Sequence, residues 1–219
     1  FQPPVGYREF TQKINSLDEN FTYLIHDEIT KDFNFRDKIQ LLHLCFTTDP
    51  FMYGREDIAQ LSMQILQRAN DSNVRCSVLT KGILPFELAQ LPMDNEYGIT
   101  VVSLSTEFTK NFEPGAAPIQ NRIAALKALS DAGCQTWVSI EPYPTPNILE
   151  QNLHEILEAV DFTDKIIFGR LHYNKIVSAY PNYKEFYNQC AAEVIRFCEE
   201  RGIGYHIKKG TITDTKEEQ

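Results

Sequence analysis

The sequence predicts an α/β fold in which helices cover a parallel sheet. From residue 41 onward, short apolar runs alternate with helix-length amphipathic segments, and the runs are nearly continuous, as in strands buried on both faces. No G-x-G-x-x-G follows the first strong strand, which weakens a dinucleotide-binding fold. A barrel or partial barrel and an open doubly wound sheet remain as alternatives at this point.

Each predicted element has its own signal. The six strands are predicted at Leu41–Phe46, Cys76–Leu79, Ile99–Leu104, Thr136–Ile140, Lys165–Phe168 and Gly204–Ile207. Five helices are predicted between them, at Glu56–Ala69, Pro85–Leu91, Pro118–Ala132, Asn147–Ala159 and Tyr183–Arg201. Apolar residues recur at helical spacing, as in Ile123, Leu126, Leu129 and Ala132, and in Ile148, Leu149, Leu153, Ile156 and Leu157. Gly133 and Gly202 follow two of these helices as stop signals.

The chain of 219 residues is long enough for one sizeable domain. We divide it into an irregular segment 1–40, a core 41–210 and a frayed tail 211–219. The first segment is predicted to hold at most a short helix near Arg8–Leu17 and an apolar stretch at Phe21–Ile25. Because the chain begins with Phe1, we expect its natural N-terminus to lie upstream.

Composition narrows the function classes. A formal net charge of -9 gives no support for binding to nucleic acid, since such a chain gains little from counterion release. No apolar window approaches the length of a membrane span and no secretory leader is recognisable, so we expect a cytoplasmic protein. The five cysteines, Cys45, Cys76, Cys134, Cys190 and Cys198, are scattered and odd in number, which favours buried free thiols over disulfides. Metal-binding spacings such as C-x-x-C and H-E-x-x-H are absent.

Polar residues follow every predicted strand. The strand ends carry Thr47, Thr48 and Asp49; Thr80, Lys81 and Gly82; Ser103, Ser105 and Glu107; Ser139 and Glu141; Gly169, Arg170 and His172; and His206, Lys208 and Lys209. Ligands of parallel α/β folds bind outside the carboxyl ends of the strands, so this pattern predicts a ligand site at one edge of the sheet.

Each of these residues also has a structural interpretation. Asp49 either caps the following helix or accepts hydrogen bonds from an ammonium group. Glu141 is expected to meet a cation or a ligand donor, because an unpaired buried carboxylate is costly. Lys81 is either a solvated turn residue or a ligand contact, and Arg170 either neutralises Glu141 or binds a ligand. His172 and His206 are predicted to be structural.

Four segments carry a family resemblance: "LLHLCFTTDPF", "VLTKG", "FEPGAAPIQNRIAALKALSDAGCQTWVSIEPYPTP" and "IIFGRLHYN". Their order and spacing resemble radical S-adenosylmethionine (SAM) proteins of the spore-photoproduct-lyase-like branch, over about Leu41 to Asn174. The resemblance implies a partial (β/α)₆ TIM-like barrel of parallel strands. It also implies a [4Fe–4S] cluster, S-adenosylmethionine as the cofactor, and reductive cleavage to a 5′-deoxyadenosyl radical that acts on a substrate. The substrate and the oligomeric state are not readable.

The resemblance also implies residue roles. Thr47, Thr48 and Asp49 would meet the methionine amino group, Lys81 its carboxylate, Ser103 and Ser105 the ribose, Ser139 and Glu141 the cofactor or substrate, and Gly169 the adenine. Glu113 and Arg122 would form a structural pair that fixes the loop between them.

The sequence departs from the family in one respect. The family's C-x₃-C-x₂-C cluster loop should precede Leu41, and no cysteine trio has that spacing. We prefer the explanation that the loop lies outside this sequence. A cluster-free barrel that binds a nucleotide-like ligand or a protein partner is the alternative, and a loop from another chain is the third. An ordinary barrel hydrolase or lyase using Glu141 and Lys81 is a further hypothesis.

Overall fold

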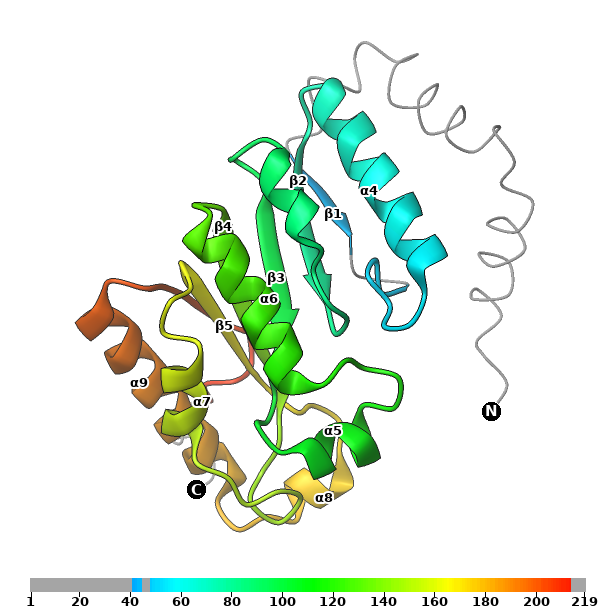
Figure 1. The fold of residues 1–219 in the computed structure, drawn as a ribbon. Helices are drawn as coiled ribbons and strands as arrows, with labels where there is room; N and C mark the ends of the chain where they lie inside the picture. Colours follow the sequence, from blue (N-terminus) through cyan, green and yellow to red (C-terminus); the bar gives the residue numbers. More distant parts are fainter. Residues whose placement is uncertain (1–40, 45–47, 214–219) are drawn as a thin grey trace.

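The computed structural model describes residues 41–44 and 48–213. The expectations for Arg8–Leu17, Phe21–Ile25, Cys45, Thr47 and most of the tail therefore lie outside the described residues. The described part forms one parallel six-stranded sheet with flanking helices, as predicted (Figure 1). None of the helices in these ranges is both long and apolar enough to cross a membrane.

The strands follow one another across the sheet in chain order, β1-β2-β3-β4-β5-β6. They are β1 Leu41–Leu44, β2 Arg75–Thr80, β3 Glu96–Thr100, β4 Gln135–Tyr143, β5 Lys165–Arg170 and β6 Gly204–Ile207. A doubly wound sheet reverses its strand order at a switch point and carries helices on both faces. Here the order does not reverse, and helices α4, α6, α7 and α9 lie on one face (Figure 1), which distinguishes a partial barrel from the doubly wound alternative.

The helical segments are α4 Glu56–Asp71, the 3₁₀ turn η1 Phe86–Gln90, α5 Thr106–Phe112, α6 Ile119–Asp131, α7 Leu153–Ala159, α8 Lys175–Ser178 and α9 Tyr183–Arg201. Gly133 and Gly202 follow α6 and α9 with φ angles of 86° and 69°, which confirms both stop signals. Helices α5 and α8 were not predicted; a serine caps the first and an asparagine the second.

Two predicted elements differ from the observed ones by four residues or more at one end. The third strand covers Glu96–Thr100 rather than Ile99–Leu104, because Glu96 already pairs with Ser77 on β2 and Gln135 on β4. The helix predicted at 147–159 begins only at Leu153, where the side chain of Asn152 accepts a hydrogen bond from the backbone N–H of His154. A local cap sets the start of the helix, whereas pairing of Glu96 with Ser77 and Gln135 on the neighbouring strands sets the start of β3, and an apolar pattern reveals neither.

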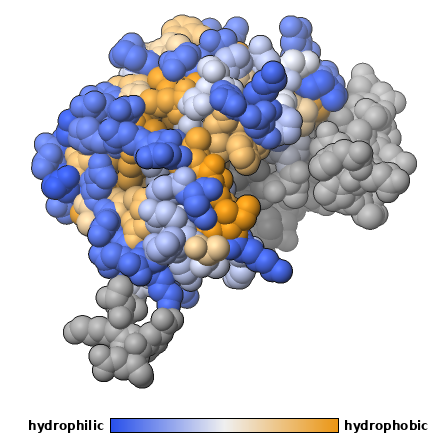
Figure 2. Space-filling view, turned by 90° about the horizontal axis from the view of Figure 1, so that it is seen from below, coloured by the Kyte–Doolittle hydropathy of each residue, from blue (hydrophilic) through white to orange (hydrophobic). Residues whose placement is uncertain are grey.

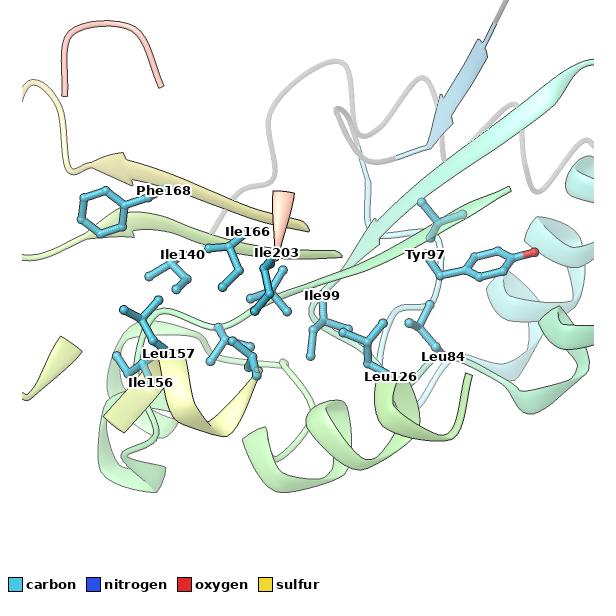
Figure 3. Packing of buried hydrophobic residues seen from close by; sticks show 14 of the residues in the cluster. Leu84, Tyr97, Ile99, Leu126, Ile140, Ile156, Leu157, Ile166, Phe168 and Ile203 are labelled. Carbon is cyan, nitrogen blue, oxygen red and sulfur yellow. The ribbon is translucent and has the colours of Figure 1, made fainter. Parts of the chain in front are cut away.

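The hydrophobic core lies between the sheet and the helices. Side chains of β3, β4 and β5 alternate, and Ile99, Ile140 and Phe168 belong to the set that packs toward α6 and α7 (Figure 3). The intervening residues point to the opposite face, here called the inner face. Residues on the inner face include Ser139 and Gly98, and Gly98 pairs with Trp137 of the neighbouring strand. Any ligand that enters the barrel from its inner side would meet this second set.

The four described cysteines are buried free thiols, as predicted. Burial raises the pKa of Cys76 and Cys190 to about 12 and that of Cys198 to about 11, and it also raises the pKa of Cys134. Since the thiolate is the reactive form, alkylation by iodoacetamide at mildly alkaline pH should be on the order of 100-fold slower in the native protein than in urea. Peptide mass mapping would test this, and rapid native labelling of any of the four would contradict the packing described here.

Candidate functional site at the carboxyl ends of the strands

All six strands run in the same direction, so their carboxyl ends lie at one edge of the sheet, here called the rim. Helices α5 and α8 lie beyond the rim (Figure 1). Seen from this side (Figure 2), hydrophilic residues surround a group of hydrophobic ones. Exposed apolar side chains of the rim loops include Ile83, Phe112, Tyr173 and Ile176. The rim is therefore neither uniformly polar nor uniformly apolar.

Asp49 joins the loop after β1 to the end of β2. Its Oδ1 accepts hydrogen bonds from the Phe51 backbone N–H, at 3.0 Å, and from the Thr80 hydroxyl, and its Oδ2 accepts one from the Lys81 backbone N–H at 2.7 Å. The Thr80 Oγ1 in turn accepts a hydrogen bond from the Gly82 N–H at 2.7 Å. Three of the acceptor positions of Asp49 are thus taken by the protein, so a variant of Asp49 would change stability as well as any ligand contact. Thr48 lies half-buried beside it.

A buried ionic cluster lies behind Lys81. The Lys81 Nζ lies 2.9 Å from Glu113 Oε1, and Arg122 Nη2 donates to Glu113 Oε2 at 2.7 Å. Arg122 is 0% exposed, and its remaining donors reach the carbonyls of Ala117, at 2.8 Å, and Thr100, at 3.0 Å. The predicted Glu113–Arg122 pair is confirmed. Lys81, whose side chain is 40% exposed, is an unpredicted third member.

A depression of about 500 Å³ borders this cluster, between α5 and the start of α6. Glu113, Thr106, Thr109 and Lys110 are among its lining residues. Lys81 and Arg122 already balance the charge of Glu113. We therefore expect Glu113 to contribute little to the binding of a charged ligand in this depression.

Ser103 and Ser105 follow β3 rather than end it. Ser103 Oγ accepts a hydrogen bond from the Ser105 backbone N–H at 3.1 Å, and Ser105 Oγ accepts one from the Phe108 N–H at 3.2 Å as the N-cap of α5. Both serines were expected at the end of the third strand, but β3 ends at Thr100, so they lie in the segment that follows it. Each hydroxyl still has its own proton to donate.

Ser139, Glu141 and Gly169 lie together on the inner face near the rim. Glu141 and Gly169 are neighbours across β4 and β5, and a Cβ on Gly169 would come within 2.8 Å of Glu141 Cδ. Glu141, whose side chain is 30% exposed, lies 3.4 Å from Lys208 Nζ through Oε2. The cation expected beside Glu141 is therefore Lys208. Arg170 instead donates through Nε to His172 Nδ1 at 3.2 Å.

Trp137 is an inner-face residue that the sequence reasoning missed. Its ring lies on Gly98, where a Cβ would come within 2.3 Å of the indole, and the ring centroid is 5.7 Å from Lys165 Nζ and 6.1 Å from the His43 ring. Burial lowers the pKa of His43. The indole Nε1 is buried and has no acceptor among the described residues. The available sequence signal was the chain's single tryptophan, which lies within a predicted strand.

Comparison with solved structures shows which known proteins share this fold. No protein-family model matches the sequence. The structure is similar to that of a spore photoproduct lyase variant solved with bound AdoMet and dinucleoside spore photoproduct, with a TM-score of 0.59 and 14% identity over 85% of this chain and 66% of that one. Streptococcus suis SuiB bound to S-adenosylmethionine is also similar, with a TM-score of 0.50 and 17% identity over 77% of this chain and 37% of that one. The partial-barrel fold predicted through the resemblance is thereby confirmed.

One sequence relative is a protein of unknown function. It is the uncharacterized protein ORF301 of Acidianus two-tailed virus, which is 24% identical over 131 residues, or 57% of this chain and 42% of the relative. The chain thus spans less than half of this relative and about two thirds of spore photoproduct lyase.

Proposed function

We propose that the chain is the S-adenosylmethionine-binding barrel core of a radical SAM enzyme, with the ligands of its [4Fe–4S] cluster supplied from outside these 219 residues. The observation that carries the proposal is the sheet itself. Six parallel strands in chain order bring hydroxyls, a carboxylate and a lysine to one rim, in a fold shared with proteins solved with S-adenosylmethionine. We further propose a cytoplasmic setting, which suits four buried reduced thiols.

The rim side chains fit a zwitterionic cofactor. Lys81 follows β2 and Glu141 lies near the end of β4, so two strand spacings, roughly 10 Å, separate their backbones. Both side chains are partly exposed, and the 3.4 Å contact of Glu141 with Lys208 is longer than a tight charge-assisted hydrogen bond. Lys81 would attract the methionine carboxylate, and Glu141 a cationic or donor group. Thr48, Ser139 and, outside the described residues, Thr47 would add hydroxyls.

The backbone near Gly169 would border the adenine, and the hydroxyl protons of Ser103 and Ser105 would reach toward the ribose. Asp49 would act by holding Lys81 and the loop after β1 in place, since its oxygens already accept three hydrogen bonds. The chain's own contribution is thus to bind and orient the cofactor and to exclude water from it. When cluster and cofactor are both bound, reductive cleavage of the cofactor supplies the 5′-deoxyadenosyl radical.

The described residues do not fit the cluster itself. They contain no group of three cysteine, histidine or carboxylate side chains placed to hold a metal ion. The described cysteines are buried singly, and two of them lie on α9. We therefore derive no step through the cluster from this chain.

The rival hypotheses differ in what the rim does. A cluster-free barrel would use the same residues to bind a nucleotide-like ligand or a protein partner without catalysis. A hydrolase or lyase that paired Glu141 with Lys81 gains no support, because Lys81 contacts Glu113 and Glu141 contacts Lys208.

Calorimetry with S-adenosylmethionine tests the proposed site. We expect saturable binding that Lys81→Gln and Glu141→Gln each weaken by roughly 5- to 30-fold, as for the loss of a hydrogen bond to a charged group. Lys127→Gln and Glu87→Gln, at exposed positions away from the rim, are the matched controls and should bind like the parent. Absence of binding, or unchanged affinity in both rim variants, would refute the assignment.

Anaerobic iron–sulfur reconstitution of the complete gene product then separates the first two hypotheses. Formation of 5′-deoxyadenosine under reducing conditions is expected for a radical SAM enzyme. Binding of S-adenosylmethionine without cluster uptake and without this product would favour the cluster-free barrel.

A further inference from the structure

Three neutral polar side chains of the inner face have no hydrogen-bond partner among the described residues. Trp137, which is 5% exposed, has a buried Nε1 without an acceptor. The hydroxyls of Thr100 and Ser139 likewise meet no donor or acceptor in the described part of the chain, although these residues are only 4% and 5% exposed. Native proteins seldom leave buried polar groups unpaired. Trp137, Thr100 and Ser139 are here called the inner neutral site.

The three side chains lie close together on β3 and β4. Thr100 pairs with Ser139, and Gly98 pairs with Trp137 two residues nearer the amino ends of the strands. The indole lies on Gly98, where a Cβ would come within 2.7 Å of Nε1. Gly98 and Thr100 are two residues apart on one strand, roughly 7 Å. One small group can therefore lie between the indole N–H and the two hydroxyls.

The charges on either side of the inner neutral site are already paired. Toward the amino ends of the strands, Lys165 Nζ lies 3.0 Å from Glu96 Oε2. Toward the rim, Lys208 Nζ lies 3.4 Å from Glu141 Oε2. A charged ligand group buried between these pairs would lack a free counter-charge, which is costly, whereas the indole and the two hydroxyls offer hydrogen bonds to a neutral group. The site therefore favours an uncharged polar group.

We propose that the inner neutral site binds an uncharged amide-type group, CO–NH, of a small ligand that enters the barrel from its inner side. The carbonyl oxygen accepts a hydrogen bond from Trp137 Nε1–H, and the ligand N–H donates to the hydroxyl oxygen of Thr100 or Ser139. Two hydrogen bonds of about 2.9 Å, with the width of one amide between them, match the separation along the strands. Trp137 and Thr100 are not among the expected cofactor contacts, so the site does not depend on the proposed function.

NMR of the indole N–H tests the site on the whole chain without cofactor or cluster. The chain has one tryptophan, so one indole resonance reports on Trp137. Titration with 2-pyrrolidinone, a neutral lactam, should shift this resonance downfield and saturably in the millimolar range. Pyrrolidinium chloride, a cation of the same ring size without an acceptor, is the matched control and should leave it in place. A resonance that the lactam does not move, or that both compounds move equally, would overturn the proposal.

A tryptophan analogue separates ligand binding from packing. β-(3-Benzothienyl)alanine keeps the bicyclic ring but has sulfur in place of the N–H, and its incorporation alters Trp137 alone because the chain has one tryptophan. We expect the affinity for 2-pyrrolidinone to fall at least about 5-fold, while the urea midpoint stays equal or rises, since an unpaired buried donor is removed. Unchanged affinity would show that the N–H does not bind the lactam. A lower midpoint would show that it has a partner in the free protein, and either result rejects the site.

A hydroxyl variant and a competition experiment complete the test. Thr100→Val should weaken lactam binding by about 3- to 10-fold, whereas Ser178→Ala, which removes an exposed hydroxyl on α8, should bind like the parent. Equal weakening in both variants would reject the site. A lactam shift that persists in saturating S-adenosylmethionine assigns the site to a second ligand, and a shift that is blocked assigns it to the uncharged adenine of the cofactor. If S-adenosylmethionine does not bind, the proposed function fails while the lactam result stands.

Discussion

Arg122→Met is expected to lower the free energy of unfolding by about 3–5 kcal/mol, as measured by urea denaturation. Arg122 is fully buried and neutralises Glu113, so its loss leaves a buried carboxylate with only the partly exposed Lys81 for a partner. The carbonyls of Ala117 and Thr100 lose a donor as well. The expected decrease in the free energy of unfolding therefore has two causes, an unpaired buried charge and the loss of hydrogen bonds to buried carbonyl groups.

Two further variants isolate the cause. Lys127→Met removes an exposed cation from the same helix and should cost no more than about 0.5 kcal/mol, since its contact with Asp131 is a surface pair. The double variant Arg122→Met/Glu113→Gln should be less destabilised than the sum of the two single variants, because the charge left unpaired is then also removed. A loss below about 1 kcal/mol for Arg122→Met would mean that the cluster does not support the fold.

Gly82→Ala is expected to destabilise the protein by about 3 kcal/mol or more, because the new methyl group has no room. A Cβ at this position would lie 1.6 Å from the carbonyl oxygen of Phe51, a backbone atom that no rotamer change can move away. The clash lies where Asp49 joins the two loops, so the variant should also disturb the end of β2. Thermal denaturation and hydrogen exchange of the Lys81 amide would measure both effects.

Gly204→Ala is the matched control. Its Cβ would lie 3.2 Å from the Asp164 carbonyl oxygen, on an edge strand, so a shift of a few tenths of an ångström suffices. We expect a change below about 1 kcal/mol. If Gly82→Ala is tolerated as well as Gly204→Ala, the loop after β1 does not lie against Gly82 in the way described.

Much of the architecture could be predicted from local patterns. Apolar runs such as Ile166 and Phe168 mark buried parallel strands, and the 3.6-residue stripe of α6 marks its packed face, because burial acts on each segment separately. The glycines that end α6 and α9 were readable for the same reason. The boundary of β3 was not, since the pairing of Glu96 with Ser77 and Gln135 is a long-range property.

The candidate site divides in the same way. The residue types alone indicated that polar groups follow each strand, and the family resemblance implied the pair of Glu113 with Arg122. Only the tertiary structure assigned the other partners, placing Lys81 on Glu113, Lys208 on Glu141 and the amide of Lys81 on Asp49. The physical reason is the distance along the sequence over which each interaction acts. Strand and helix formation reflect spacing along the chain, whereas a charge pairs with whichever opposite charge the assembled sheet brings within a few ångströms.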